Sequence, residues 1–237
     1  MYSNYIKLAL RNMAKNRLYA AINIIGLAIG LAVFLFGSIL ASYERNHDSM
    51  FSNRDRIFTA GSVFAADADI GVLETDSIYT AMTPLIENGV SELDAIARTV
   101  SREFLISVGA NQDSYYQTVS FADPALTLIF DFHYLFGEAS ALDDPSGIIL
   151  SASAAQKFFG RTDVIGEVLT LDHAEDMRVA AVIADSPSDS HFNSSLLLER
   201  EEIIFAPIKA LETIDYYEFT GNWNNLSIVD MTYILLN

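Results

Sequence analysis

The hydrophobic pattern of the chain is dominated by an apolar run from Leu18 to Tyr43, 26 consecutive residues without Asp, Glu, Lys or Arg. At about 1.5 Å per residue a helix over this run is about 39 Å long, enough to cross a hydrocarbon core of about 30 Å with some tilt. A signal peptide is the competing interpretation, but its apolar region spans about 7–15 residues and ends at a small-residue cleavage site. This run is longer and has no A-x-A site at its end. The pattern therefore predicts an uncleaved transmembrane helix over residues 18–43.

Residues 1–17 predict an amphipathic helix with a basic stripe. Lys7, Arg11 and Lys15 recur every fourth residue, which places them on one side of a helix. Such a helix lies in the lipid headgroup layer with its basic side chains near anionic lipid. Two interpretations stay open: a positively charged flank with no further role, or a cytoplasmic elbow that contacts membrane lipid and a partner protein.

The charge distribution gives the orientation. The chain holds 14 Lys and Arg against 31 Asp and Glu, a net charge of −17. Four basic residues precede residue 18, so residues 44–237 hold 10 basic and all 31 acidic residues, a net charge of −21. Positively charged flanks stay in the cytoplasm, so residues 44–237 are expected outside it. An acidic surface argues against nucleic-acid binding, and the absence of cysteine excludes disulfides, thiol catalysis and cysteine metal sites.

Small residues mark one face of the expected transmembrane helix. Gly26 and Gly30 form a GxxxG pattern, and Gly37 and Ala41 continue it. Small side chains let a second helix approach closely within a membrane. Gly26 and Gly30 are therefore expected to lie at a helix-packing interface.

Residues 44–237 alternate between strand-like and helix-like patterns, which predicts an α+β fold: a mixed extracytoplasmic domain on a single N-terminal transmembrane helix. Asp123 is expected to cap a helix with Pro124 at its first position, and Ser151 and Gly160 are expected to begin and end another. The expected strands are Arg56–Phe64, Ala95–Val108, Tyr115–Phe121, Ile148–Leu150, Val168–Asp172, Met177–Asp185, Leu196–Leu198 and Thr232–Leu236. The expected helices are Ser77–Asn88, Pro124–Phe130, Ser151–Phe159 and an acidic stretch from Arg200 to Leu211.

The sequence holds no complete catalytic, metal-binding or nucleotide-binding motif, so no enzyme activity, catalytic residue, metal or cofactor is expected. Asp185, Ser186 and His191 are the residue types of a hydrolase triad, but such triads are assembled from separated segments. The turn His173–Asp176 and the partial calcium pattern over Asp67–Gly71 are each better explained as solvated loops. The glycine-bounded segment Gly160–Glu167 has five residues between its glycines, and Glu stands where a phosphate-binding Lys is required.

Many short motifs in order resemble the MacB-like periplasmic core domain of FtsX/MacB-like ABC transporter permeases. The resemblance covers nearly the whole chain, from a first membrane helix to a closing Thr-Tyr-Ile-Leu segment. It is carried by Asn23–Ala32, Phe121–Pro124, Phe130–Phe132, Leu135–Gly137, Ala141–Leu142, Asp144–Pro145, Ser151, Ala154–Ala155, Phe159–Gly160, Ile165–Gly166, Leu169, Val182–Pro187, Ser190–Phe192, Trp223 and Thr232–Leu235.

Two departures from the family pattern stand out. The usual Asp-Pro-Ile-Gly-Lys appears as Asp163–Glu167, without the proline and with one charge reversed. Family members also continue into three further membrane helices, whereas this sequence holds no second charge-free run of about 18 residues. The sequence is therefore expected to be a fragment or a shortened gene product.

The resemblance implies a mechanical function. A partner ABC ATPase would bind ATP in the cytoplasm, and a permease dimer in the bacterial inner membrane, with a periplasmic adaptor, would act on peptides, drugs or lipoproteins. Within that scheme the core motif residues Phe121, Asp123, Pro124, Ser151, Gly160 and Gly166 would hold the periplasmic core together. A membrane-anchored sensor and a tethered binding or chaperone module are the alternatives, and an ATPase or kinase gene nearby would distinguish them.

Overall fold

The computed structural model describes residues 2–65, 67, 74–109, 113–187, 190–193, 202–214 and 230–237. The chain divides into two compact units, Met1–His47 and Asp48–Asn237. The second unit is called the body below. The expected strand Leu196–Leu198, the calcium-like pattern after Asp67 and Trp223 lie outside the described residues.

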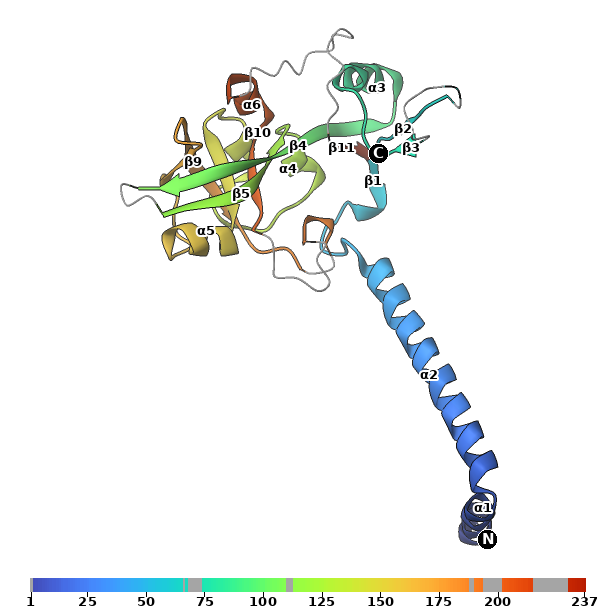
Figure 1. The fold of residues 1–237 in the computed structure, drawn as a ribbon. Helices are drawn as coiled ribbons and strands as arrows, with labels where there is room; N and C mark the ends of the chain where they lie inside the picture. Colours follow the sequence, from blue (N-terminus) through green and yellow to red (C-terminus); the bar gives the residue numbers. More distant parts are fainter. Residues whose placement is uncertain are drawn as a thin grey trace. The chain divides into compact units, whose positions relative to one another are not determined.

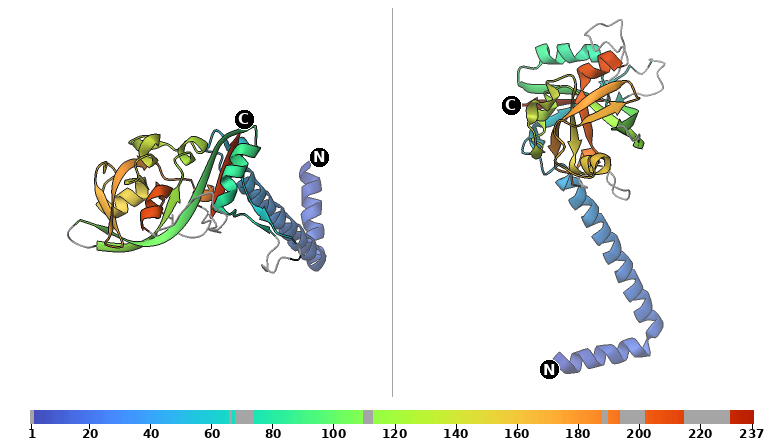
Figure 2. Two further views of the ribbon diagram at one scale, coloured as in Figure 1. Left: turned by 90° about the horizontal axis from the view of Figure 1, so that it is seen from above. Right: turned by 90° about the vertical axis from the view of Figure 1, so that its left-hand side faces the viewer.

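The first unit consists of two helices, α1 (Tyr2–Lys15) and α2 (Arg17–Asn46). The chain turns sharply between them at Asn16 (Figure 2). Among the described residues one helical segment, Arg17–Tyr43, is long and apolar enough to cross a membrane, with 27 residues and a mean hydropathy of 2.6. None of that window is buried against the rest of the chain. We call α2 the stem.

The body is built on a sheet whose strands close into a ring. β4 (Leu93–Val108) and β5 (Asp113–Ala122) form a long antiparallel hairpin that crosses the body (Figure 1). Beyond β5 the pairing continues through β10 (Ile204–Pro207), β7 (Gly147–Ser151) and β9 (Glu175–Ile183). β8 (Val168–Leu171) pairs with both β9 and β4 and thereby closes the ring.

The remaining elements extend this ring or cover it. β11 pairs with the first half of β4, β1 pairs with β11, and β6 pairs with β9. β2 and β3 form a separate small hairpin. The bounds of these strands are β1 Ile57–Thr59, β2 Ser62–Val63, β3 Glu74–Thr75, β6 Tyr134–Phe136 and β11 Met231–Leu236. The α-helices of the body are α3 Thr83–Gly89, α4 Leu126–Ile129, α5 Ala152–Phe159 and α6 Ile208–Ile214, and its 3-10 turns are Arg54–Arg56, Thr80–Met82, Ala139–Leu142 and His191–Asn193.

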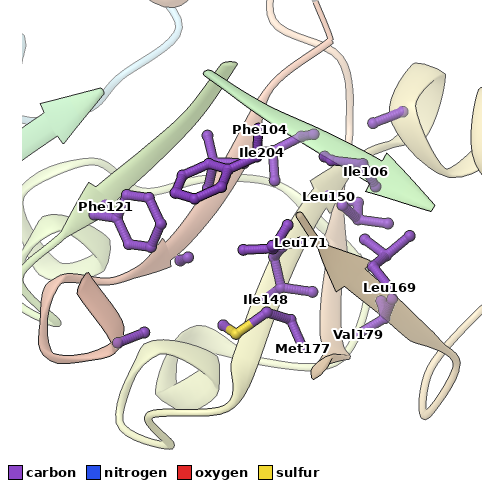
Figure 3. Close-up of a cluster of buried hydrophobic side chains, with 14 of the residues drawn as sticks. Phe104, Ile106, Phe121, Ile148, Leu150, Leu169, Leu171, Met177, Val179 and Ile204 are labelled. Carbon is purple, nitrogen blue, oxygen red and sulfur yellow. The ribbon is translucent and has the colours of Figure 1, made fainter. Parts of the chain in front are cut away.

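Alternation along the strands divides the buried side chains into two clusters, because successive residues of a strand point to opposite faces. In β7, Ile148 and Leu150 belong to the first cluster, which fills the ring, whereas Ile149 belongs to the second. Figure 3 shows the first cluster converging from β4, β5, β7, β8, β9 and β10. Phe104 and Phe121 meet there edge to face, with ring centroids 5.6 Å apart. The second cluster lies outside the ring and is rich in phenylalanine.

Most expected elements are present, with two differences in extent. The expected strand Arg56–Phe64 is two short strands, β1 and β2, because residues Ala60 and Gly61 are not in strand conformation. The expected helix Ser77–Asn88 begins only at Thr80 as a 3-10 turn and continues as α3. The α+β class and the hairpins β4–β5 and β8–β9 are confirmed.

Two expectations are wrong. Within the expected acidic helix Arg200–Leu211, residues 204–207 form strand β10. All four of its residues are buried, and pairing on both sides with β5 and β7 outweighs any helical preference. Asp123 does not cap the next helix, and Pro124 is not at its first position: α4 begins only after Ala125, and no side chain caps it.

Candidate functional site

The residues expected to act at the membrane all lie in the first unit. Lys7, Arg11 and Lys15 are exposed along α1. A Cβ atom added at Gly26 or Gly30 would meet nothing within 4 Å, so this face of the stem is open in the described chain. Their expected roles, at lipid or a partner and in helix packing, remain predictions.

Asp123 is occupied by an ion pair in the body. Its Oδ2 accepts hydrogen bonds from Arg98 Nε at 2.7 Å and from the Arg98 backbone N–H at 2.9 Å, and its Oδ1 accepts from Arg98 Nη2 at 2.9 Å. The Asp123 N–H in turn donates to Arg98 O at 3.1 Å. The two side chains are only 16% and 18% exposed. Asp123 therefore fastens the end of β5 to β4, and this is why its carboxylate is not free to cap α4.

The pKa of Arg98 reflects this pairing. Burial lowers the pKa of the Arg98 guanidinium, but the hydrogen bonds and charge of Asp123 raise it by more, so the net shift is upward. Glu87 and Glu212 add to the upward shift. The Arg98 guanidinium is therefore charged at any physiological pH.

The other residues of the Phe121 motif lie beside this pair. Phe121 is fully buried within the ring. The carbonyl oxygen of Pro124 accepts hydrogen bonds from the Thr127 N–H at 3.2 Å and the Thr127 hydroxyl at 2.9 Å, which shapes the turn into α4. Their placement is that of structural residues.

Ser151 joins three elements. Its Oγ accepts from the Ala154 N–H at 3.2 Å, which caps α5 as expected, and also from the Ile203 N–H at 3.1 Å. The Ser151 N–H donates to Ile203 O at 2.8 Å. One serine thus links β7, the start of α5 and the residue before β10.

Gly160 and Gly166 hold backbone conformations that favour glycine. Gly160 ends α5 with φ +69°, and Gly166 has φ +85°. The Gly166 N–H donates to Val179 O at 2.8 Å, which holds the loop before β8 onto β9. Strand β8, not a helix, follows this loop. A phosphate loop needs a helix N-terminus at that point.

The structure brings together a polar cluster that sequence reasoning missed. Asp48 Oδ1 accepts from Ser190 Oγ at 2.9 Å and from the His191 N–H at 3.0 Å, and Asp48 Oδ2 lies 2.8 Å from His191 Nδ1. His191 Nε2 lies 3.1 Å from the Tyr233 hydroxyl. Asp48 and His191 are 143 residues apart in the chain, so no local spacing signals their contact.

Aromatic rings surround this polar cluster. Phe51, which is 1% exposed, packs against Phe130 with ring centroids 4.9 Å apart, and Phe130 packs against Tyr233 at 4.9 Å. A hollow of about 400 Å³ opens beside it. The lining residues of the hollow include Asp48, Arg54, Ile57, Phe130, His191, Met231 and Tyr233.

The candidate triad is not assembled. Asp185 Oδ1 accepts from the Ser153 N–H at 2.8 Å, and Ser186 is buried. His191 pairs with Asp48 instead of with Asp185. No group of three or more metal-ligating side chains occurs among the described residues.

An α+β body that follows one candidate membrane-spanning helix is typical of a membrane-anchored domain. In the described part of this body the candidate site residues make structural contacts, and no catalytic triad is assembled. Residues 20–236 match the family model of the MacB-like periplasmic core domain. The chain therefore belongs to this family and is a MacB-like periplasmic domain of the ABC-type permeases, which are non-enzymatic transporter components. No curated protein matches the sequence.

Two solved structures show the same fold, and a third is less similar. A domain of a candidate permease protein from Porphyromonas gingivalis is 21% identical, with 79% of this chain and 75% of that chain covered and a TM-score of 0.59. The extracellular domain of the noncanonic ABC-type transporter YknZ from Gram-positive bacteria is 12% identical, with 76% and 83% covered and a TM-score of 0.51. The periplasmic region of MacB from Actinobacillus actinomycetemcomitans is 11% identical, with 76% and 72% covered and a TM-score of 0.49.

Proposed function

We propose that this chain is the N-terminal part of a permease subunit that couples ATP hydrolysis by a partner ABC ATPase to movements of the body outside the bacterial inner membrane. The observation that carries the proposal is the family match, which extends over the stem and the body together. A chain that is continuous from a membrane helix into a well-packed domain is suited to convey displacement. The substrates proposed are peptides, drugs or lipoproteins that are already outside the membrane.

The orientation proposed places α1 in the cytoplasm. Lys7, Arg11, Lys15 and Arg17 precede the span, and such positive flanks remain on the cytoplasmic side. The basic side chains of α1 are exposed and available to anionic lipid or to the ATPase. Gly26 and Gly30 then offer the close-packing face for another helix of a permease dimer.

The nucleotide is assigned to the partner and not to this chain. The nearest imitation of a phosphate loop, Gly160–Glu167, follows a helix and leads into a strand, and Glu167 pairs with Arg161 at 2.6 Å. A carboxylate in this position would repel phosphate. ATP binding is therefore proposed for the ATPase subunit alone.

Affinity purification of the protein from native membrane, followed by mass spectrometry, tests the proposal. Co-purification of a nucleotide-binding ABC subunit is the expected result, and stimulation of its ATPase activity is the next assay. Recovery of the protein without any ATPase would contradict the permease function and favour a single-anchor sensor or binding module. A periplasmic adaptor among the recovered proteins would identify the third partner.

A further inference from the structure

Strand β1 lies at one end of the main sheet of the body. It pairs with β11 on one side, and no strand of the described residues pairs with its other side. Phe58 is 50% exposed, and Thr59 is exposed as well. An edge strand presents unpaired backbone N–H and C=O groups, which can pair with a further strand from another chain.

The register with β11 shows which backbone groups of β1 face the open edge. The Ala60 N–H donates to Thr232 O at 2.9 Å, so these two residues form a hydrogen-bonded pair. Hydrogen-bonded and non-hydrogen-bonded pairs alternate along an antiparallel ladder, so Thr59 and Tyr233 form a non-hydrogen-bonded pair. The N–H and C=O of Thr59 therefore point away from β11, and so does the C=O of Ile57.

The open edge ends at Ile57. Its N–H donates to Arg54 O in the 3-10 turn before β1, and is therefore not available to an added strand. A peptide that runs antiparallel to β1 would find two hydrogen-bonding groups at Thr59, one at Ile57 and no further ladder beyond it. The edge therefore suits a peptide whose chain ends opposite Ile57.

The hollow of about 400 Å³ described above adjoins this edge. All three residues of β1 line it, and every described residue that lines it belongs to the body. Thr59 lies directly opposite Tyr233 in the sheet, so both side chains are on the face that borders the hollow. Alternate side chains of an added strand would point toward the same face.

The walls of the hollow suit apolar side chains. Ile57, Phe130, Met231 and Tyr233 supply aliphatic and aromatic surface. A volume of about 400 Å³ also lies within the range of about 300–1,000 Å³ that is usual for ligand sites. An apolar hollow beside an open strand edge is the arrangement by which peptide-binding domains combine backbone pairing with side-chain selection.

One positive side chain borders the hollow. Arg54 is the one Lys or Arg among the described lining residues. Its Nε lies 3.4 Å from Asp55 Oδ1, but the Asp55 side chain is 89% exposed, and such an open ion pair contributes little. The carboxylate of Asp48, which also lines the hollow, already accepts hydrogen bonds from Ser190 and His191. Arg54 can therefore pair with an anionic group of a ligand.

The position and the charge of Arg54 indicate which anion fits. Arg54 lies in the turn just before β1, at the end of the edge where an antiparallel peptide would terminate. A C-terminal carboxylate would supply one negative charge there. Residues 44–237 carry a net charge of −21, which disfavours any further negative charge on the ligand. A peptide with neutral or basic side chains and a free C-terminus is complementary to both.

We propose that the open edge of β1 and the adjoining hollow form a binding site for the C-terminal segment of an extended peptide. The peptide adds to β1 as an antiparallel strand, and its last and third-last residues place apolar side chains in the hollow. Its terminal carboxylate pairs with Arg54. The binding needs no ATPase and goes beyond the proposed function; only the use of the site for a transported peptide rests on that function.

Calorimetric titration of the whole chain in lipid nanodiscs tests the site, with empty nanodiscs as the blank. The probe is the soluble peptide acetyl-Lys-Lys-Thr-Val-Thr-Leu with a free carboxylate, whose valine would lie opposite Thr59. We expect saturable binding of one peptide per chain. The C-terminal amide of the same peptide is expected to bind at least about tenfold more weakly, because it lacks the charge that pairs with Arg54. Methylation of the valine nitrogen removes the donor to Thr59 O and is expected to weaken binding at least about fivefold.

Variants of Arg54 test the carboxylate contact from the side of the protein. Arg54→Met is expected to weaken binding of the free acid at least about tenfold and to leave binding of the amide unchanged. Arg54→Lys should recover part of the loss because it restores the charge. The matched control is Arg161→Met, since Arg161 is also an exposed arginine in an ion pair but does not line the hollow.

Hydrogen exchange at single-residue resolution tests strand addition. Saturating peptide is expected to slow exchange of the Thr59 amide at least about tenfold, because this N–H faces the open edge. The Phe58 amide faces β11 in the alternating ladder and should be little affected. The two neighbouring amides thus serve as test and control within one strand.

Each contradictory result removes a defined part of the proposal. Equal binding of the acid and the amide, or an unchanged affinity in Arg54→Met, would overturn the carboxylate contact. Full binding of the methylated peptide with an unprotected Thr59 amide would overturn strand addition. Binding no greater than that of empty nanodiscs would overturn the site as a whole. None of these results bears on co-purification of an ATPase, which tests the proposed function separately.

Discussion

The stem and the interior of the ring are built from the same apolar residue types but have different surroundings. In α2, Leu27 is 75% exposed and Phe34 is 68% exposed on the isolated chain. In the ring, Ile148 and Leu150 are fully buried by side chains from other strands. Apolar surface in the stem must therefore be covered by lipid or another helix, whereas in the body it is covered by the fold. The two regions should respond differently to the same substitution.

The largest difference is expected from truncating a large apolar side chain. Phe121→Ala should lower the free energy of unfolding of the body by about 3–5 kcal/mol, since it removes a fully buried ring and leaves a cavity. Leu27→Ala in the stem should leave that free energy unchanged. Denaturant unfolding of the whole chain in mild detergent, followed by near-ultraviolet circular dichroism, measures both. Equal losses of unfolding free energy in Phe121→Ala and Leu27→Ala would contradict the difference between the body and the stem.

A smaller loss is expected from the ion pair between Asp123, at the end of β5, and Arg98 of β4. Asp123→Ala should cost about 2–4 kcal/mol, because it leaves the Arg98 charge largely desolvated without its partner. The matched control is Glu167→Ala: its pair with Arg161 has side chains 46% and 53% exposed, and such pairs contribute less than about 1 kcal/mol. Similar losses in the two variants would show that burial does not distinguish these pairs.

The serine at the start of α5 should contribute less again. Ser151→Ala removes the acceptor for the Ala154 and Ile203 N–H groups, at a cost of about 1–2 kcal/mol. Ser151→Thr keeps the hydroxyl and is expected to recover part of the loss. The same denaturant unfolding measures both variants, and no loss in Ser151→Ala would contradict the capping role.

The contribution of Asp48 should depend on pH. Its folded pKa lies below the ordinary value of 3.8, so its stabilising effect is complete above the unfolded pKa and is lost as the pH falls through the folded pKa. The difference in unfolding free energy between the unsubstituted chain and Asp48→Asn should therefore be present above about pH 4 and shrink as the pH falls below it. A difference that grows on acidification would reverse the assigned sign.

The smallest effect on the body is expected from crowding the stem. Gly26→Leu and Gly30→Leu together meet no neighbour among the described residues, so unfolding of the body should not change. Assembly of the complex should be blocked, because large side chains keep a second helix at a distance. Complex formation is measured by native mass spectrometry or co-purification, and normal assembly of the double variant would remove the packing prediction.

Local signals in the sequence were sufficient where neighbours in the chain are also neighbours in space. The hairpins β4–β5 and β8–β9 and the helix from Ser151 to Gly160 follow from alternation, a serine cap and a glycine end. The stem could be predicted from composition alone, because a helix that spans a bilayer needs only sufficient length and apolar side chains. The family itself was recognisable from the order of many short motifs.

The tertiary structure decided the contacts between distant segments. Strand β10 is a strand because β5 and β7 lie on both sides of it, although the residues around it suggested an acidic helix. Asp123 looked like a helix cap, and its true partner, Arg98, lies 25 residues earlier. Asp48 and His191 meet across 143 residues. Such pairings depend on the closed ring of strands, which no local propensity encodes. The sequence by itself therefore determined the apolar stem and the fold class of the body. Only the tertiary structure decided which distant residues pair within the body.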